Sequence, residues 1–284
     1  MVSSSIPARA TCKLILDVAN QLPADERLWR AATARFPVQD VRVEWETNIP
    51  KSRGLGGSTA LLAATLACVL RARGEEPELA TAEGRSKFAE LVRDVELNDA
   101  EIACGFQDAY MVVHGGLQEM DFDGKEPESP GPIATLTSLQ MTLPFLLIST
   151  DVERLSGSVH GPMIERWRSG EREVVRGIAE IVSIGAQAAE ALRAKDWTEL
   201  SDLMTRNHAI VASLGGSGEA IDALINDSKA CGALAAKLAG AGMGGTVIAL
   251  TMDPHGLQTK LRQRGYTLFM RPSIEPGLRF EESR

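Results

Sequence analysis

The stretch that decides the fold runs from Val41 to Gly74 and reads VRVEWETNIPKSRGLGGSTALLAATLACVLRARG. Its first seven residues alternate apolar and charged side chains, which is the period-two pattern of a half-buried strand. A glycine-rich loop follows. The run after the loop is rich in strong helix formers up to Gly74, and glycine commonly ends helices. The stretch therefore predicts a strand, a glycine-rich loop and a helix in succession.

The loop at residues 51–57 opens this helix, and such a turn presents backbone N–H groups and the positive end of the helix dipole. Phosphate is the obvious anion for this kind of site. A tight turn that is capped by Ser58 or Thr59 and binds nothing explains the same segment equally well. The loop is not a Walker A motif, because no lysine precedes Ser58.

A second glycine cluster lies near the end of the chain, in KLAGAGMGGTVIAL at residues 237–250. Gly240, Gly242 and Gly245 fit the pattern G-x-G-x-x-G, but a dinucleotide-binding loop must open a helix, and the TVIAL that follows is strand-like. With Val247 they also fit the glycine loop of protein kinases, yet none of the later protein-kinase motifs follows. By itself the segment predicts a glycine hairpin between two strands.

The rest of the chain mixes helical and strand-like patterns, which indicates an α+β fold with helices packed on an antiparallel sheet. The turn-rich segment DGKEPESPGP, at residues 123–132, is the best linker and places a domain boundary near 130–142. In the first half of the chain we further expect two helices over 13–34 with a break at Pro23, an acidic helix over 85–103, and strands at 111–122 and 141–150. In the second half we expect helices over 159–231 with breaks at 169–170, 195–196 and 215–218, then a helix near 255–264 and a strand at 266–271.

Length and composition are those of a folded soluble protein. At roughly 150 residues per domain, a chain of 284 residues fits two domains or one large one. The 44% of hydrophobic and 24% of charged residues are an ordinary balance. A net charge of −8 supplies no positive field for nucleic acid or an anionic membrane, so we expect neither as a partner. The four cysteines form no CxxC pair, and the sequence shows no export signal, which favours a reducing cytoplasm.

Together, the two glycine segments resemble the paired signatures of the GHMP small-molecule kinases, the family of galactokinase, homoserine kinase, mevalonate kinase and phosphomevalonate kinase. The resemblance extends from about residue 41 to the C-terminus. Three further segments look most like the branch of heptose-phosphate kinases and glucuronokinases: GFQDAYMVVHGGLQEMDF, RLSGSVH and LMTRNHAIVASLGGS. The resemblance implies a ribosomal S5 domain 2-like N-terminal domain over 1–138, which binds phosphate, and a ferredoxin-like C-terminal domain over 139–284.

The same resemblance implies roles for individual residues, with ATP and Mg²⁺ as the cofactors. Asp108, in CGFQDAY, matches the catalytic aspartate of the family. Glu96 matches the carboxylate that coordinates magnesium, and Ser58 matches the hydroxyl that completes the metal site. The nucleotide-binding positions that the two glycine segments match are Pro50, Gly54, Leu55, Gly56, Gly57, Ser58, Thr59, Gly240, Gly242 and Gly244.

The residues taken alone leave alternatives open. Glu96 lies in the charged run VRDVELNDAE, so it also fits an exposed helix face, and Asp94 or Asp99 would compete with it as a metal ligand. Asp108 also fits a helix N-cap. Binding residues tend to lie on loops, and a glycine-containing loop carries three candidate substrate contacts, Ser156, Ser158 and His160.

The function that the resemblance implies is ATP-dependent phosphorylation of a sugar or sugar acid, at the anomeric hydroxyl if the branch is right. A mevalonate- or homoserine-type kinase is the alternative enzyme, and a nucleotide- or sugar-binding regulator without catalysis is the alternative outside enzymes. The regulator is considered because only 49 residues precede Pro50 and none of them resembles the family's N-terminal strand motif. We therefore expect a short or incomplete member of the family, and the oligomeric state stays open.

Overall fold

The computed structural model describes residues 1–23, 25–51, 53–125, 132–150, 152, 160–240 and 245–281. The chain divides into two compact units. The amino-terminal unit consists of Ser3–Pro50, Gly56–Leu139 and Ile274–Arg284, and the carboxy-terminal unit consists of Met1–Val2, Lys51–Leu55 and Gln140–Ser273. The expected domain division between residues 138 and 139 stays a prediction.

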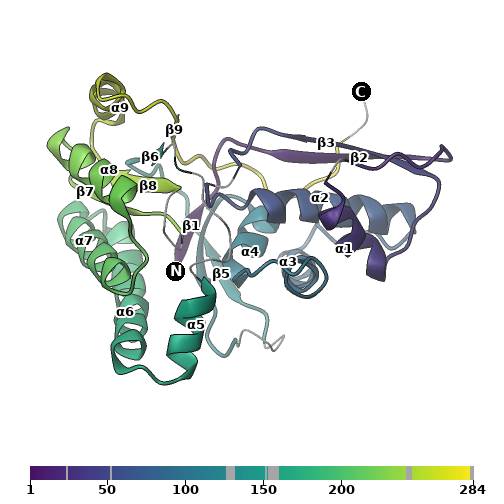
Figure 1. Ribbon diagram of the computed structural model, residues 1–284, viewed down its shortest axis with the longest axis horizontal. Helices are drawn as coiled ribbons and strands as arrows, with labels where there is room; N and C mark the ends of the chain where they lie inside the picture. Colours follow the sequence, from purple (N-terminus) through teal and green to yellow (C-terminus); the bar gives the residue numbers. More distant parts are fainter. Residues whose placement is uncertain are drawn as a thin grey trace. The chain divides into compact units, whose positions relative to one another are not determined.

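The amino-terminal unit confirms the strand, loop and helix predicted around the first glycine cluster. Strand β3 (Val41–Thr47) precedes the loop, and helix α2 (Gly57–Ala72) follows it. β3 pairs antiparallel with β2 (Ala10–Leu16), and the two-stranded ribbon lies alongside α2 and α1 (Arg27–Arg35) (Figure 1). Burial of the inward side of β3 against these helices holds the ribbon in place.

The helix expected over the first part of residues 13–34 is wrong, because this segment contributes to β2 and the bend that follows it. Cys12 and Leu14 pack on the same apolar cluster, so the burial period along this segment is two and not 3.6. A short apolar run fits either period, and pairing with β3 decides between them. The second helix expected there is confirmed as α1.

Helices α3 (Ala82–Asn98) and α4 (Phe106–His114) complete the helical core of this unit. Strand β4 (Leu117–Asp121) lies between β1 (Val2–Ser4) and β5 (Thr135–Ser138) in a three-stranded sheet. The strand expected over 111–122 is therefore only partly right, since its first residues belong to α4. Two glycines with positive φ, Gly115 and Gly116, end this helix before the strand begins.

The last residues of the chain return to the amino-terminal unit and pack on the end of α4. The N–H of Leu278 donates to the carbonyl of Val112 at 3.0 Å. A Cβ built at Gly277 would lie 2.2 Å from the carbonyl oxygen of Val113, so only glycine allows this close approach. The unit therefore contains segments from both ends of the sequence.

The carboxy-terminal unit is built on a four-stranded antiparallel sheet in the order β7-β8-β6-β9. Two helices, α8 and α9, bury Ile221, Leu224 and Leu257 against one face of this sheet. The two strands predicted around the second glycine turn are confirmed, because β7 and β8 pair with each other, and residues 241–244 between them lie outside the described residues. The elements of this core are β6 (Phe145–Ser149), β7 (Ala235–Leu238), β8 (Thr246–Leu250), β9 (Phe269–Met270), α8 (Glu219–Ala230) and α9 (Pro254–Gln263).

The helices expected over 159–231 are confirmed, together with all three breaks between them. They are α5 (His160–Arg168), α6 (Arg172–Ala194), α7 (Trp197–Ser213) and the α8 already described (Figure 1). Lys195 adopts φ +55° at the end of α6, and the next residue, Asp196, caps α7 through its side chain. Among the described residues, no helix is long and apolar enough to cross a membrane.

Candidate active site

The N-terminus of α2 has the form of an anion-binding site. Its N-cap is Gly56, in the left-handed region at φ +67°, and no side chain caps the helix there. The hydroxyls of Ser58 and Thr59 are engaged elsewhere, so the alternative in which either residue caps this turn is wrong. The first-turn N–H groups of a helix have no partner within the helix, which leaves this end suited to a phosphate.

Glu96 lies on α3 and is buried, with 1% of its surface exposed. The hydroxyl of Ser58 donates to its Oε1 at 2.8 Å, and the hydroxyl of Thr59 donates to its Oε2 at 2.7 Å. Both oxygens of one carboxylate are thus held at the start of α2. The interpretation of Glu96 as an exposed helix-face carboxylate is therefore wrong.

The two competing carboxylates on α3 are engaged differently. Asp94 and Asp99 both form ion pairs with Arg35 of α1, the second of them at 2.7 Å. Each has an ordinary structural explanation as a link between two helices. Glu96 is the carboxylate of this run that contacts the first turn of α2.

Asp108 is the third residue of α4, whose N-cap is Gly105. The alternative in which Asp108 caps the helix is therefore wrong. A Cβ built at Gly56 would lie 3.7 Å from Cγ and 3.9 Å from Oδ2 of Asp108, so this side chain lies directly against the loop glycine. The structure thus brings Asp108, Glu96 and Ser58 together at one end of α2.

The electrostatics of this cluster favour a cation. Burial raises the pKa of Glu96, and the negative charge of Asp108 raises it further, while the hydrogen bonds from Thr59 and Ser58 act in the opposite direction. The neighbouring thiol responds to the same field, since burial and the charge of Glu96 raise the pKa of Cys104 to about 12. A cation bound beside two such carboxylates would remove the repulsion and favour their ionised forms.

The loop before Gly56 belongs to the carboxy-terminal unit over Lys51–Leu55, and the second glycine cluster holds it there. The guanidinium of Arg53 donates to the carbonyl of Val152 at 2.9 Å, and the hydroxyl of Thr246 donates to the carbonyl of Arg53 at 3.2 Å. Gly245 has φ +99°, and a Cβ built there would lie 2.9 Å from the Arg53 carbonyl oxygen. Gly245 is therefore glycine because the backbone of Arg53, in the first glycine loop, passes against it.

Some of the sequence-predicted residues lie outside the described part of the structure. These are Ser156 and Ser158, the side chain of His160 at the start of α5, and Gly242 and Gly244 of the second glycine cluster. Gly240 is described and has φ +76° after β7. Gly54 likewise has a positive φ, of +70°, within the first loop.

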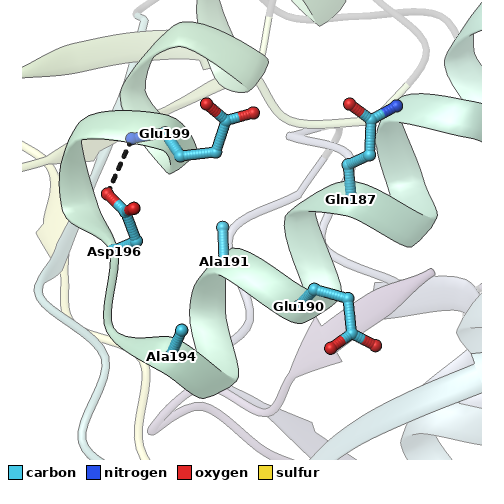
Figure 2. Close-up of a pocket in the computed structure, with 6 residues that line it drawn as sticks. All are labelled: Gln187, Glu190, Ala191, Ala194, Asp196 and Glu199. Carbon is cyan, nitrogen blue, oxygen red and sulfur yellow. Dashed lines mark hydrogen bonds between the residues drawn. The ribbon is translucent and has the colours of Figure 1, made fainter.

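A surface groove where α6 meets α7 contains no part of this cluster. Figure 2 shows Asp196 accepting a hydrogen bond from the backbone N–H of Glu199, at 3.0 Å, which caps α7. Glu190 forms an ion pair with Arg193 at 2.6 Å. Helix capping explains the carboxylate of Asp196, and the ion pair explains that of Glu190, so we assign the groove no role. Its lining residues are Gln187, Glu190, Ala191, Ala194, Asp196 and Glu199.

His114, at the end of the helix that carries Asp108, provides a pH-dependent stability term. Its Nε2 lies 3.1 Å from the hydroxyl of Ser86. Burial lowers the pKa of His114 from 6.5 to about 4, and the positive charge of Arg85 adds to the effect. The folded state therefore prefers the neutral ring, so His114 supports stability above pH 6.5 and loses that contribution as the pH falls towards 4.

Between pH 6.5 and pH 4, the variant with glutamine at His114 is expected to lose less stability than the parent, by about 1–2 kcal/mol after allowance for solvent screening. The measurement is the free energy of unfolding by urea at several pH values. His255→Gln changes an exposed histidine and is the matched control, for which the parent's pH dependence is expected. An unchanged slope in the His114 variant would show that protonation of this ring does not oppose folding.

Comparisons with known proteins identify the family of this arrangement. Residues 3–116 match the family described as GHMP kinases N terminal domain, and residues 188–267 match the one described as GHMP kinases C terminal. The chain belongs to the GHMP kinase family. The expected fold is thereby confirmed, and the cluster of Ser58, Glu96 and Asp108 lies within the N-terminal match.

The relatives include sugar-acid and mevalonate kinases. Probable glucuronokinase 2 from Arabidopsis thaliana is 30% identical over 79% of this chain and 62% of its own length, so the chain spans less than two thirds of that relative. Mevalonate kinase of L. major, solved with R-mevalonate, shares the fold with a TM-score of 0.71 at 18% identity, covering 96% of this chain and 90% of that one. The structure of a D-glycero-D-manno-heptose 1-phosphate kinase from Bacteroides thetaiotaomicron matches with a TM-score of 0.66 at 16% identity. The match covers 99% of this chain and 90% of that one.

Proposed function

We propose that this GHMP kinase family member transfers the γ-phosphoryl group of ATP to a hydroxyl of a sugar or sugar acid. The observation that carries the proposal is the buried Glu96 carboxylate, held by Ser58 and Thr59 at the N-terminus of α2 with Asp108 beside Gly56. Phosphoryl transfer requires the phosphates to be bound and their charge neutralised, with the acceptor hydroxyl oriented for attack. The cluster offers a group for each requirement.

The phosphates of ATP fit the uncapped N-terminus of α2. The N–H groups of the first turn and the helix dipole both favour an anion there. The sequence-based assignment of Pro50, Gly54, Leu55 and Gly240 to nucleotide binding stays a prediction. Gly56 adds a left-handed turn that other residues adopt only with strain.

Magnesium fits the oxygen atoms of Ser58 and Glu96. The described residues contain no group of three or more histidine, cysteine or acidic side chains that could hold a metal by itself. That matches Mg²⁺, which usually takes one or two protein oxygens and completes its shell with water and phosphate oxygens. When bound, the ion neutralises charge on the phosphates, while Glu96 and Ser58 fix its place beside α2.

Asp108 is the group that we assign to the acceptor. Its carboxylate lies against the loop glycine, where an acceptor hydroxyl must approach phosphates bound at α2. There it would orient the hydroxyl and accept its proton as the new bond to phosphorus forms. It lies in the first turn of α4, near the positive end of that helix.

The relatives support a sugar acid as acceptor. Among those compared, the two glucuronokinases are 30% identical to this chain, and the mevalonate kinases are 25–28% identical. We infer phosphorylation at the anomeric hydroxyl, which would give a sugar 1-phosphate. A mevalonate- or homoserine-type acceptor is the second candidate, because mevalonate kinases match up to 85% of the chain.

A coupled assay of ADP release with Mg²⁺ and ATP tests this proposal over a panel of glucuronate, neutral sugars, heptose phosphates, mevalonate and homoserine. The expected result is release that depends on a sugar or sugar acid. If only mevalonate or homoserine causes ADP release, the chain is a kinase of the second candidate type and the sugar acceptor is wrong. If ATP stabilises the fold but no member of the panel releases ADP, the proposal of a sugar kinase is wrong and a nucleotide-binding role is favoured.

Replacing Gly56 with valine is expected to abolish stabilisation by ATP. A β-branched residue is disfavoured at φ +67°, so the turn at the start of α2 must change, although the space beside Asp108 would hold a Cβ. At a hundredfold excess of ATP over its Kd the parent should gain about 2.7 kcal/mol, read as a rise in melting temperature.

Gly74→Val is the matched control for this variant. Gly74 follows the other end of α2, it is also left-handed at φ +76°, and a Cβ there would meet nothing within 4 Å. This control should keep the ATP effect. A folded Gly56 variant with the parent's ATP response would show that the turn does not shape the phosphate site.

A further inference from the structure

Cys12 and Cys68 are in contact, although 56 positions separate them in the sequence. Cys12 lies on β2 and Cys68 on α2, and the thiol of Cys68 donates to the backbone carbonyl of Cys12 at 3.3 Å. The spacing hides this pair from sequence analysis, where the four cysteines are expected to form no redox motif.

Both residues are partly buried, and Cys12 also packs against the apolar cluster that contains Trp29 and Val43. Helix α2 packs directly on β2, and Cys12 lies opposite Trp45 in the β2–β3 pairing. The pair therefore sits on secondary structure held by the amino-terminal unit alone. Closing a bond between the sulfurs would link two elements that already touch.

The two sulfurs differ in chemistry. The interaction with Cys12 and the positive charge of Arg71, one turn further along α2, lower the pKa of Cys68 although burial acts in the opposite direction. The interaction with Cys68 and burial both raise the pKa of Cys12. A thiol beside a cation and a second thiol is the usual setting of a nucleophilic cysteine with a resolving partner. Cys104, by contrast, lies in a negative field that raises its pKa to about 12.

We propose that Cys12 and Cys68 form a thiol–disulfide exchange site that reacts with low-molecular-weight disulfides of the glutathione type and closes into a disulfide between β2 and α2. Cys68, as thiolate, attacks one sulfur of oxidised glutathione, so that a protein–glutathione bond forms and one glutathione thiolate leaves. Cys12 loses its proton to solvent and attacks the Cys68 sulfur, releasing the second glutathione. The two protein thiols are oxidised, and one glutathione disulfide is reduced to two thiols.

The bond would stabilise the unit that carries the candidate active site. It closes a loop of 56 positions in the unfolded chain, and a long loop gives a large entropic effect. For a chain of this size the expected rise in melting temperature is roughly 5–10 °C. Added reductant should reverse it. None of these readouts depends on phosphoryl transfer, so the test of this inference is independent of the proposed function.

The experiment treats the full chain with oxidised glutathione and follows intact mass, peptide mass after proteolysis and melting temperature. The parent should lose about 2 Da and give a peptide pair joined through Cys12 and Cys68. Cys12→Ser removes the resolving thiol and should instead gain about 305 Da at Cys68. Cys68→Ser should stay unmodified at Cys12, and Cys104→Ser is the matched control that should behave as the parent.

Several results would overturn the inference. One is a parent protein that keeps four free thiols, or that gains glutathione without closing a bond. Another is a first modification at Cys104 or Cys231, which would mean that the contact with Cys12 does not activate Cys68. The parent protein alone shows whether a disulfide forms, so the test does not depend on the folding of the serine variants.

Discussion

Replacing Asp108 with asparagine is expected to lower turnover by at least about a hundredfold. Asparagine keeps the size and much of the hydrogen bonding of the side chain, but it removes the charge and the site that accepts a proton. The substitution leaves unchanged the N–H groups of α2 that we propose to bind ATP, so stabilisation by ATP should persist. The measurement is steady-state ADP release with the acceptor found in the panel, alongside melting temperature with and without ATP.

Asp94→Asn is the matched control, since it removes a carboxylate from neighbouring α3 that is paired with Arg35. Its turnover should stay within about twofold of the parent, as expected for a surface ion pair. If the folded Asp108 variant also keeps most of the parent's turnover, Asp108 is a structural carboxylate. The assignment of the proton acceptor would then be wrong.

Glu96→Gln is the second large effect, and it acts on the metal. The substitution removes the charged ligand. The glutamine carbonyl can still accept a hydrogen bond from one of the Ser58 and Thr59 hydroxyls, and the other hydroxyl can rotate to accept one from the glutamine NH2 group. We expect the Mg²⁺ concentration for half-maximal rate to rise by about tenfold or more. Turnover at fixed low Mg²⁺ should fall accordingly.

Stability in the absence of metal separates this effect from misfolding. Burial and Asp108 oppose ionisation of Glu96 in the folded state, so the uncharged glutamine should keep or raise the metal-free melting temperature. Asp99→Asn, on the same helix but paired with Arg35, serves as control and should keep the parent's magnesium dependence. The same dependence in Glu96→Gln would mean that another group holds the metal.

The sequence predicts most elements of this fold because their patterns are long or sharply bounded. The helix after the glycine loop and the four helices over 159–231 begin and end at the expected breaks. β2 is missed because seven residues with mixed apolar spacing fit two periods, and only the pairing with β3 selects one. The strand expected over 111–122 starts too early because an apolar run at the end of α4 has no helical signature of its own.

The candidate site is predicted as a set of residues but not as an arrangement. Family motifs point to Asp108, Glu96 and Ser58, and the structure adds that Thr59 holds the second oxygen of Glu96. No local pattern could show that Gly245 makes room for Arg53, because this contact joins residues far apart in the chain. The same holds for Cys12 and Cys68, whose contact depends on how α2 packs on β2.

Phosphorus NMR of the chain with Mg²⁺, ATP and the acceptor from the panel tests the central claim most directly. The account predicts a new phosphomonoester resonance that grows as ADP appears, stops when Mg²⁺ is chelated, and is nearly absent with Asp108→Asn. Coupling of that phosphorus to an anomeric proton would identify a sugar 1-phosphate. If the chain binds ATP and the acceptor but only unchanged ATP, or ADP with inorganic phosphate, is found, the claim that this site phosphorylates a hydroxyl is contradicted.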